Sequence, residues 1–409
     1  MSVAVVVMLL AIWLSSGTMA PYAATTAEPR VSEHCGYLLN IDHPHFLAPL
    51  KMLESAPPHE WSFSVVLRRL LYPIGAYPFV KLAGFEIGGF LFNLLLHACA
   101  LVSFAVFVRR RIDRRAAIVG AWLFATYPGI TYWAGLPYCY AIIVPASIWC
   151  FMALVVLEES TSLRQIALCC GALGLLFTGY DLWPFFAPPA LFMLVRRRLW
   201  AGVAVGALLL ALPTLLVTLA LQRIWHVPSS SPNSAIYGNI VHSYVAFHDF
   251  AGWWHNVKEA PRILVANYFY SNFIFLPALF LVAITTKTKI RISEAALLLM
   301  ALVLFLFNNL APPYEGWQMR GYWIPRIYQP ILGALLFYVC RAVTSARSAR
   351  WMAIATLVAI LANASVAFGP IARVPWTGLV YQRFYRHADA GALDRNLSKY
   401  GRRPLGVCQ

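Results

Sequence analysis

A short stretch near the N-terminus, EHCGYLLNIDHPHF at residues 33–46, concentrates side chains that can move protons or bind cations. It holds two carboxylates, Glu33 and Asp42, together with three histidines and Tyr37. Such a concentration stands out because only 12% of the residues in the chain are charged. A positioned carboxylate can take the proton of an attacking hydroxyl group. Glu33 and Asp42 are therefore candidates for a general base, and the two alternatives stay open at this point.

The same region could hold a divalent metal ion, because histidine and carboxylate side chains are common metal ligands. Suitable side chains are His34, His43, His45, His59, Glu33, Asp42 and Glu60. Their spacing matches no defined metal motif, so solvated loop histidines are the competing interpretation and no residue is assigned as a ligand. The chain contains no CxxC, HExxH or GxxxxGK[ST] motif. The absence of the last motif argues against direct hydrolysis of ATP.

The composition predicts that membrane-spanning helices hold this stretch in place. Hydrophobic residues make up 60% of the 409 residues, which is typical of a polytopic membrane protein. A helix needs about 20 apolar residues to cross the ~30 Å hydrocarbon layer. Long continuous apolar runs favour helices over the alternating pattern of a β-barrel. We therefore expect an all-α transmembrane bundle of about eleven spans, at residues 2–20, 86–108, 116–133, 138–157, 164–179, 183–196, 200–222, 266–284, 292–309, 326–340 and 351–368.

Basic residues are segregated between alternate connections, and this predicts the orientation of the helices. Lys and Arg accumulate in short cytoplasmic loops. Fifteen of them lie in the connections 109–115, 158–164, 195–198, 285–291 and 341–350. The opposite short connections, 134–137, 180–182 and 310–326, contain only Arg320 and Arg326. Most of the net charge of +16 is thus explained by basic residues that orient the helices in the membrane. We therefore expect no nucleic-acid partner.

This orientation divides the chain into one membrane domain and a tail. Residues 1–368 form the predicted transmembrane domain, with outer loops at 21–85 and 223–265, and residues 369–409 form a short extracytoplasmic tail. The first apolar run, 2–20, is typical of an uncleaved span or of a signal peptide. In either case residues 21–85 lie on the extracytoplasmic side. We expect a multi-pass protein of the inner or plasma membrane, surrounded by lipid, with its site on the extracytoplasmic face.

Two arginines at the outer end of the tenth span could bind phosphate. Arg320 and Arg326 flank the sequence GYWIP. Arginine binds phosphate through two parallel hydrogen bonds and stays protonated. An interfacial or salt-bridged role is the alternative for each. Arg68 and Arg69 are weaker candidates, since the pair could mark the polar face of an interfacial helix.

Other candidates for substrate contact lie in outer turns and loops. Asp181, in GYDLWPF, could bind hydroxyl groups or cap the following helix. Trp253, Trp254 and Trp323 adjoin polar groups, so they could form a wall for a sugar ring or an isoprenoid chain. An interfacial aromatic belt is the competing interpretation for these tryptophans.

Two polar residues fall inside a predicted span. Asn93 and His97 lie within 86–108, where polar side chains are costly and usually face the bundle interior. Hydrogen bonds between helices satisfy such groups. We therefore predict a structural hydrogen bond to another helix rather than a catalytic role.

The order of these parts resembles the GT-C type multi-spanning glycosyltransferases, including the protein-mannosyltransferase-like and aminoarabinose-transferase-like enzymes. A first span is followed by EHCGY, DHPHF, LRRLLYPIGAYPF and GGFLFNLLLHACALVSFAVFVRRR, and as sequence the likeness covers about residues 30–115 and 320–340. In that family the first outer loop carries a catalytic acidic residue, often in an Asp-Glu pair followed by Tyr. The resemblance implies that Glu33 is catalytic, with His34 in place of the second acid and Tyr37 as the aromatic. Asp42 matches the Asp of an Asp-His-Pro-Pro stretch in some members.

The resemblance also implies an activity and its partners. Such enzymes move a sugar from a polyprenyl-phosphate donor to a glycan, lipid or protein acceptor on the extracytoplasmic face, with Arg320 and Arg326 in the region that holds the lipid phosphate. No cofactor is certain, although a divalent metal could take part. An O-antigen ligase or polymerase is a close alternative, but it would rely on a large late outer loop that 223–265 only partly provides. A lipid or solute transporter and a non-catalytic scaffold are further alternatives, and no internal repeat of the transporter kind is found.

Overall fold

Helices make up all the regular secondary structure in the described part of the chain. The computed structural model describes residues 2–17, 69–83, 85–127, 130, 134, 139–224, 275–310, 329–345 and 349–368. No strand occurs among these residues. The predicted all-α class is therefore confirmed for the described residues.

The helices match the predicted apolar runs, each of which overlaps at least one helix. The α-helices are α1 (Ser2–Gly17), α6 (Leu71–Ala83), α7 (Phe85–Arg111), α8 (Arg114–Ala125), α10 (Ile143–Glu159), α11 (Leu163–Phe177), α12 (Trp183–Arg196), α13 (Trp200–Arg223), α16 (Phe275–Ile284), α17 (Ile292–Leu310), α19 (Leu332–Thr344) and α20 (Ala349–Phe368). Two 3₁₀ turns, η1 (Cys139–Ile142) and η2 (Gln329–Ile331), precede α10 and α19. Helix α6 lies inside the expected outer loop 21–85 and was not predicted from the sequence.

Two helices are long and apolar enough to cross a membrane, Ile87–Arg111 of α7 and Trp200–Ala220 of α13. Only 11% of the second is buried, and Leu208, Leu215 and Leu216 are among its exposed residues, which is unlike the core helix of a soluble protein. Contiguous exposed apolar patches of this kind are rare on soluble monomers and mark membrane or protein contacts. The structure thus supports membrane association, and the eleven crossings remain a prediction.

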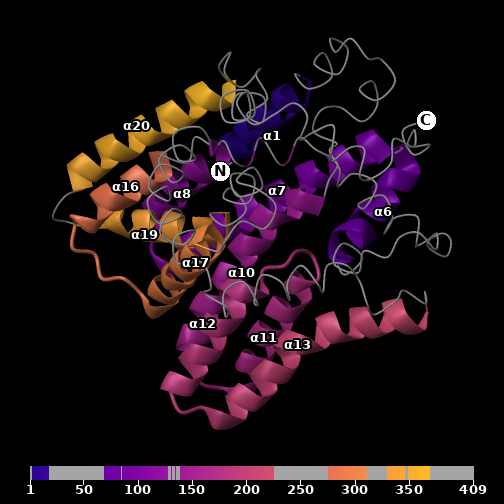
Figure 1. The fold of residues 1–409 in the computed structure, drawn as a ribbon. Coiled ribbons are helices and arrows are strands. Elements are labelled where there is room, and N and C mark those ends of the chain that lie inside the picture. Colours follow the sequence, from indigo (N-terminus) through magenta and orange to yellow (C-terminus); the bar gives the residue numbers. More distant parts are fainter. Residues whose placement is uncertain are drawn as a thin grey trace.

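The centre of the bundle is formed by α7, α10 and α19, while α13 and α20 lie at its edges (Figure 1). The ring of Phe337 on α19 lies 5.6 Å from that of Phe107 and 5.7 Å from that of Phe151. The indole nitrogen of Trp149 on α10 donates to the hydroxyl of Ser103 on α7 at 2.8 Å. These contacts fix the relative positions of the three helices along the bundle.

A glycine allows α11 and α13 to approach closely. A Cβ atom on Gly174 would lie 2.2 Å from the carbonyl oxygen of Leu209 and 3.0 Å from that of Leu210. Because these are backbone atoms, no side-chain rotation could relieve the clash. In the same helix, a Cβ atom on Gly171 would meet no atom within 4 Å.

We expect Gly174→Ala to lower the free energy of unfolding by about 1–3 kcal/mol, because overpacking forces the two helices apart. Gly171→Ala is the matched control. It should raise the free energy of unfolding by up to ~1 kcal/mol, since alanine is the better helix former. Thermal unfolding of both variants in one detergent would measure the difference. Equal unfolding temperatures would contradict the close approach of α11 and α13.

Candidate functional site

Polar side chains gather at two ends of α7. Asn93 stands near one end and Arg111 ends the helix at the other. The 18 residues between them span about 27 Å at a rise of 1.5 Å per residue. This length is close to the ~30 Å thickness of the hydrocarbon layer. Asn93 and Arg111 therefore lie about one membrane thickness apart along α7.

The first group surrounds an ion pair between Arg69 and Asp181. The Oδ2 atom of Asp181 accepts from Nη2 of Arg69 at 2.5 Å and from Nε at 3.2 Å. The guanidinium also lies over the ring of Tyr180, 4.3 Å from its centroid. Arg69 is 7% exposed, whereas 27% of the Asp181 side chain is exposed. Arg69 thus holds one oxygen of a carboxylate that still reaches the surface.

The local backbone explains why two distant segments meet here. The N–H of Leu71, at the start of α6, donates to the carbonyl of Thr178, which follows α11, at 3.3 Å. Arg69 precedes α6 by one residue and Asp181 lies in the turn before α12, so this bond brings the pair together. Arg69 lies within the expected outer loop 21–85, 36 residues after Glu33. The ion pair therefore links that expected loop to the turn before α12.

The structure corrects the capping interpretation of Asp181. The N-cap residue of α12 is Leu182, and no side chain caps that helix. The Asp181 carboxylate instead pairs with a residue 112 positions earlier. This pairing also neutralises Arg69, so a phosphate at Arg69 would have to compete with Asp181. We therefore interpret Arg69 as a positioning residue for Asp181 rather than as a phosphate ligand.

Asn93 is held by Tyr72 at the start of α6, three residues after Arg69. Asn93 accepts from the hydroxyl of Tyr72 on α6 at 2.8 Å and donates to the carbonyl of Ala134 at 3.1 Å. The predicted bond to another helix is confirmed for Asn93. His97 behaves differently, because its Nδ1–H donates to the carbonyl of Asn93 in the same helix at 2.9 Å. Its buried Nε2 atom has no hydrogen-bond partner among the described residues.

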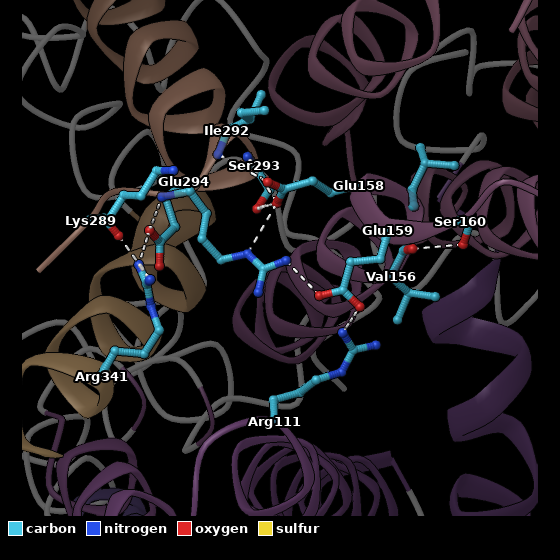
Figure 2. A network of polar contacts seen from close by, with 12 residues as sticks. Arg111, Val156, Glu158, Glu159, Ser160, Lys289, Ile292, Ser293, Glu294 and Arg341 are labelled. Atoms are coloured by element: carbon cyan, nitrogen blue, oxygen red, sulfur yellow. Dashed lines mark hydrogen bonds and ion pairs between the residues drawn. The ribbon is translucent and has the colours of Figure 1, made fainter. Parts of the chain in front are cut away.

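The second group is a network of ion pairs at the other end of the bundle (Figure 2). Glu158 on α10 accepts from the hydroxyl of Ser293 at 2.6 Å and from Nε of Arg291 at 3.2 Å. Glu159 accepts from Nη2 of Arg291 at 2.6 Å and from Arg111 of α7. Burial raises the pKa of Glu158, but these hydrogen bonds and the Arg291 charge outweigh it and hold that pKa below its usual range.

Two further arginines extend this network to α12 and α19. Arg341 donates to the buried carboxylate of Glu294 and, at 2.9 Å, to the carbonyl of Lys289. Arg197 donates to the carbonyls of Leu157 and Glu158, each at 3.0 Å, and to that of Ser160 at 2.5 Å. The five basic connections identified in the sequence thus meet at one end of the bundle. We call it the network end, made of residues 109–115, 158–164, 195–198, 285–294, 341–345 and 349–350.

The remaining predicted site residues lie outside the described part of the chain. They are Glu33, His34, Tyr37, Asp42, Trp253, Trp254, Arg320, Trp323 and Arg326. Their roles stay predictions, as does the extracytoplasmic tail. Among the described residues, no group of three His, Cys, Asp or Glu side chains could hold a metal ion. The histidine-rich stretch 33–46 lies outside the described residues, so metal binding there stays a prediction.

Sequence reasoning missed the most informative feature of the described site. It placed Arg69 and Asp181 on the same side of the membrane but did not pair them. No protein-family model, curated protein or solved structure matches the chain.

Proposed function

We propose that the chain is an integral membrane glycosyltransferase that moves a sugar from a polyprenyl-phosphate donor to an acceptor outside the cytoplasm. One observation carries the proposal. Arg69, in the expected outer loop 21–85 that carries the predicted base, pairs with Asp181 of a second expected outer connection, whereas the basic connections meet at the network end. Because basic connections favour the cytoplasm, the pair and the loop belong to the opposite face.

The proposed reaction uses a carboxylate and two arginines in distinct roles. Glu33 takes the proton of the acceptor hydroxyl as its oxygen attacks C1 of the donor sugar. A bond from the acceptor oxygen to C1 forms while the bond from C1 to the phosphate oxygen breaks. Arg320 and Arg326 stabilise the charge on the departing phosphate. Asp181, anchored through Arg69, accepts hydrogen bonds from sugar hydroxyl groups, and Tyr37 and His34, neighbours of Glu33 in the sequence, would contact the substrate.

The aromatic residues of the later outer segments complete the proposed substrate site. Trp253, Trp254 and Trp323 would pack against the sugar ring or the first isoprenoid units. Apolar faces such as that of α13 would meet the lipid tail of the donor. An acceptor of glycan, lipid or protein type would approach from the aqueous side.

Comparing cells with and without the protein tests this function directly. Loss of a transferase should cause one polyprenyl-phosphate sugar to accumulate and one surface glycan to lose that sugar. Restoring the wild-type chain should reverse both changes. A lipid-linked pool and surface glycans that stay the same would exclude the proposal, and accumulation of a longer lipid-linked polymer would favour the ligase or polymerase alternative.

The orientation predicts which positions a membrane-impermeant thiol reagent can reach. Cysteines introduced at Arg110 and Arg350 should react only after the membrane is opened, because the network end faces the cytoplasm. A cysteine introduced at Lys81, on α6, should react in intact cells. Labelling of Arg350→Cys from outside while Arg110→Cys stays protected would contradict an odd number of crossings.

Asp181→Asn should lower kcat/KM for transfer by about 10–100-fold, the effect of losing a hydrogen bond that a substrate hydroxyl group donates to a charged carboxylate. Arg69→Gln should cause a smaller loss, because it frees the carboxylate without removing it. In the double variant the two losses should not add, since the residues act as one pair. Normal kcat/KM with a lowered unfolding temperature would show that the pair is only structural.

A further inference from the structure

The network end carries many exposed basic side chains that no described acidic group neutralises. Its four acidic residues are already engaged, since Asp113 caps α8 by accepting from Ala116 N–H and the other three form the network. Ten exposed basic side chains make no ion pair with a described residue. They are Arg109, Arg110, Arg114, Arg115, Arg164, Arg196, Arg198, Lys287, Lys289 and Arg350, and we call them the basic surface.

Two of these cations stand at backbone positions that favour glycine. Arg198 and Lys287 have φ values of 58° and 57°, and they are the non-glycine residues with positive φ in the described chain. Arg198 follows the C-cap of α12, where its own N–H donates to Val195 and that of Leu199 donates to Leu194. This helix-ending motif usually has glycine at the Arg198 position, because a Cβ atom is unfavourable there. Both positions hold an exposed cation instead, at the expense of backbone strain.

Exposed apolar side chains adjoin the basic surface at the level where a bilayer would begin. Trp200 is 65% exposed and Trp351 is 76% exposed, and each lies within two residues of Arg198 or Arg350. Tryptophan favours the boundary between headgroups and hydrocarbon. Further along α13 and α20, the side chains of residues 208, 215, 354 and 358 are also exposed and apolar. The cations therefore lie at the headgroup level of the adjacent leaflet.

We propose that the basic surface binds the phosphate groups of anionic phospholipids, with Arg198 and Lys287 among the contacts. Arginine suits a phosphate because its planar donors match two oxygens at once, and lysine adds a point charge. A basic residue near an anionic leaflet strengthens association by about fivefold. This inference requires the membrane placement of the chain and is independent of sugar transfer. Lipid binding would give these exposed basic side chains a role in addition to orienting the helices in the membrane.

The test measures lipid selectivity for the full chain in nanodiscs of mixed phosphatidylglycerol and phosphatidylcholine. Spin-labelled forms of the two lipids report which one the protein immobilises. The wild type should prefer phosphatidylglycerol, and ~0.5 M salt should remove most of this preference by screening. In the double variant Arg198→Gly and Lys287→Gly, the preference should fall by about fivefold or more. Its unfolding temperature should stay equal or rise, because glycine relieves the strained backbone at both positions.

A charge-matched control separates local binding from the effect of net charge. Lys81→Gln with Arg223→Gln removes two positive charges outside the network end, from the last turns of α6 and α13, and it should leave the preference unchanged. An equal loss in both double variants would overturn the proposal in favour of bulk electrostatics. Unchanged preference in the glycine variant, or no preference in the wild type, would overturn it as well. Displacement of the labelled phosphatidylglycerol by millimolar inorganic phosphate would show a free-anion site instead.

Discussion

Glu33→Gln should slow sugar transfer by about 10²–10⁴-fold while leaving the affinity for the donor nearly unchanged. Glutamine has almost the same size as glutamate but cannot accept the proton of the acceptor hydroxyl. The rate is best measured in a single turnover, with the lipid-linked sugar that accumulates in cells lacking the protein. Membrane insertion and donor binding of the variant are checked first, so that a misfolded protein is not scored as inactive.

Asp42→Asn is the matched comparison, because it changes the second carboxylate of the same stretch. We expect this variant to keep most of its rate, since Asp42 precedes the HPH turn and such a side chain often bonds to its own backbone. Near-normal transfer by Glu33→Gln together with an inactive Asp42→Asn would exchange the two roles. Normal transfer by both variants would remove this loop from the proposed mechanism.

Arg341→Met should lower the free energy of unfolding by about 3–5 kcal/mol. The substitution removes the cation that pairs with Glu294, whose side chain is 1% exposed, and leaves a buried carboxylate without this partner. Arg110→Met is the control at the same end of the bundle. Arg110 is exposed and makes no ion pair with a described residue, so its loss should change stability by about 0.5 kcal/mol or less. Thermal unfolding in detergent would measure both.

A second substitution tests whether the uncompensated charge causes the loss. Replacing a whole buried ion pair by apolar residues is often neutral. Glu294→Leu added to Arg341→Met should therefore recover much of the lost stability, although the bond from Arg341 to the Lys289 carbonyl stays broken. A double variant that is less stable than Arg341→Met alone would contradict this explanation.

The helices could be predicted from the sequence because long apolar runs leave few alternatives for a backbone that must satisfy its own hydrogen bonds. The exceptions have local causes. Helix α6 escaped prediction because Pro73, Gly75 and Pro78 interrupt its apolar pattern. Helix α19 continues beyond the predicted span 326–340, because Arg341 finds partners in the network end and need not leave the helix.

The candidate site was less predictable than the helices because pairing depends on tertiary contacts. Asn93 could be assigned a structural role from its depth in a span alone, since a buried amide there needs partners. The partner of Asp181 could not be assigned, because 112 residues separate it from Arg69 and a local capping role was equally compatible with the sequence. The described structure shows this pair, while the predicted base and phosphate ligands remain inferences from residue type and spacing.

The ion pairs of the network end can form only in a certain order while the chain is being synthesised. Glu159 can meet Arg111 as soon as α10 has emerged, because only 48 residues separate them. Glu158 has to wait for Arg291, which is 133 residues later and takes the ribosome on the order of ten seconds to reach. Glu294 then waits a further 47 residues for Arg341. The N-terminal helices can therefore associate early, whereas Glu158, which joins α10 to the start of α17, and Glu294, which joins α17 to α19, gain these partners only after the later segments are made.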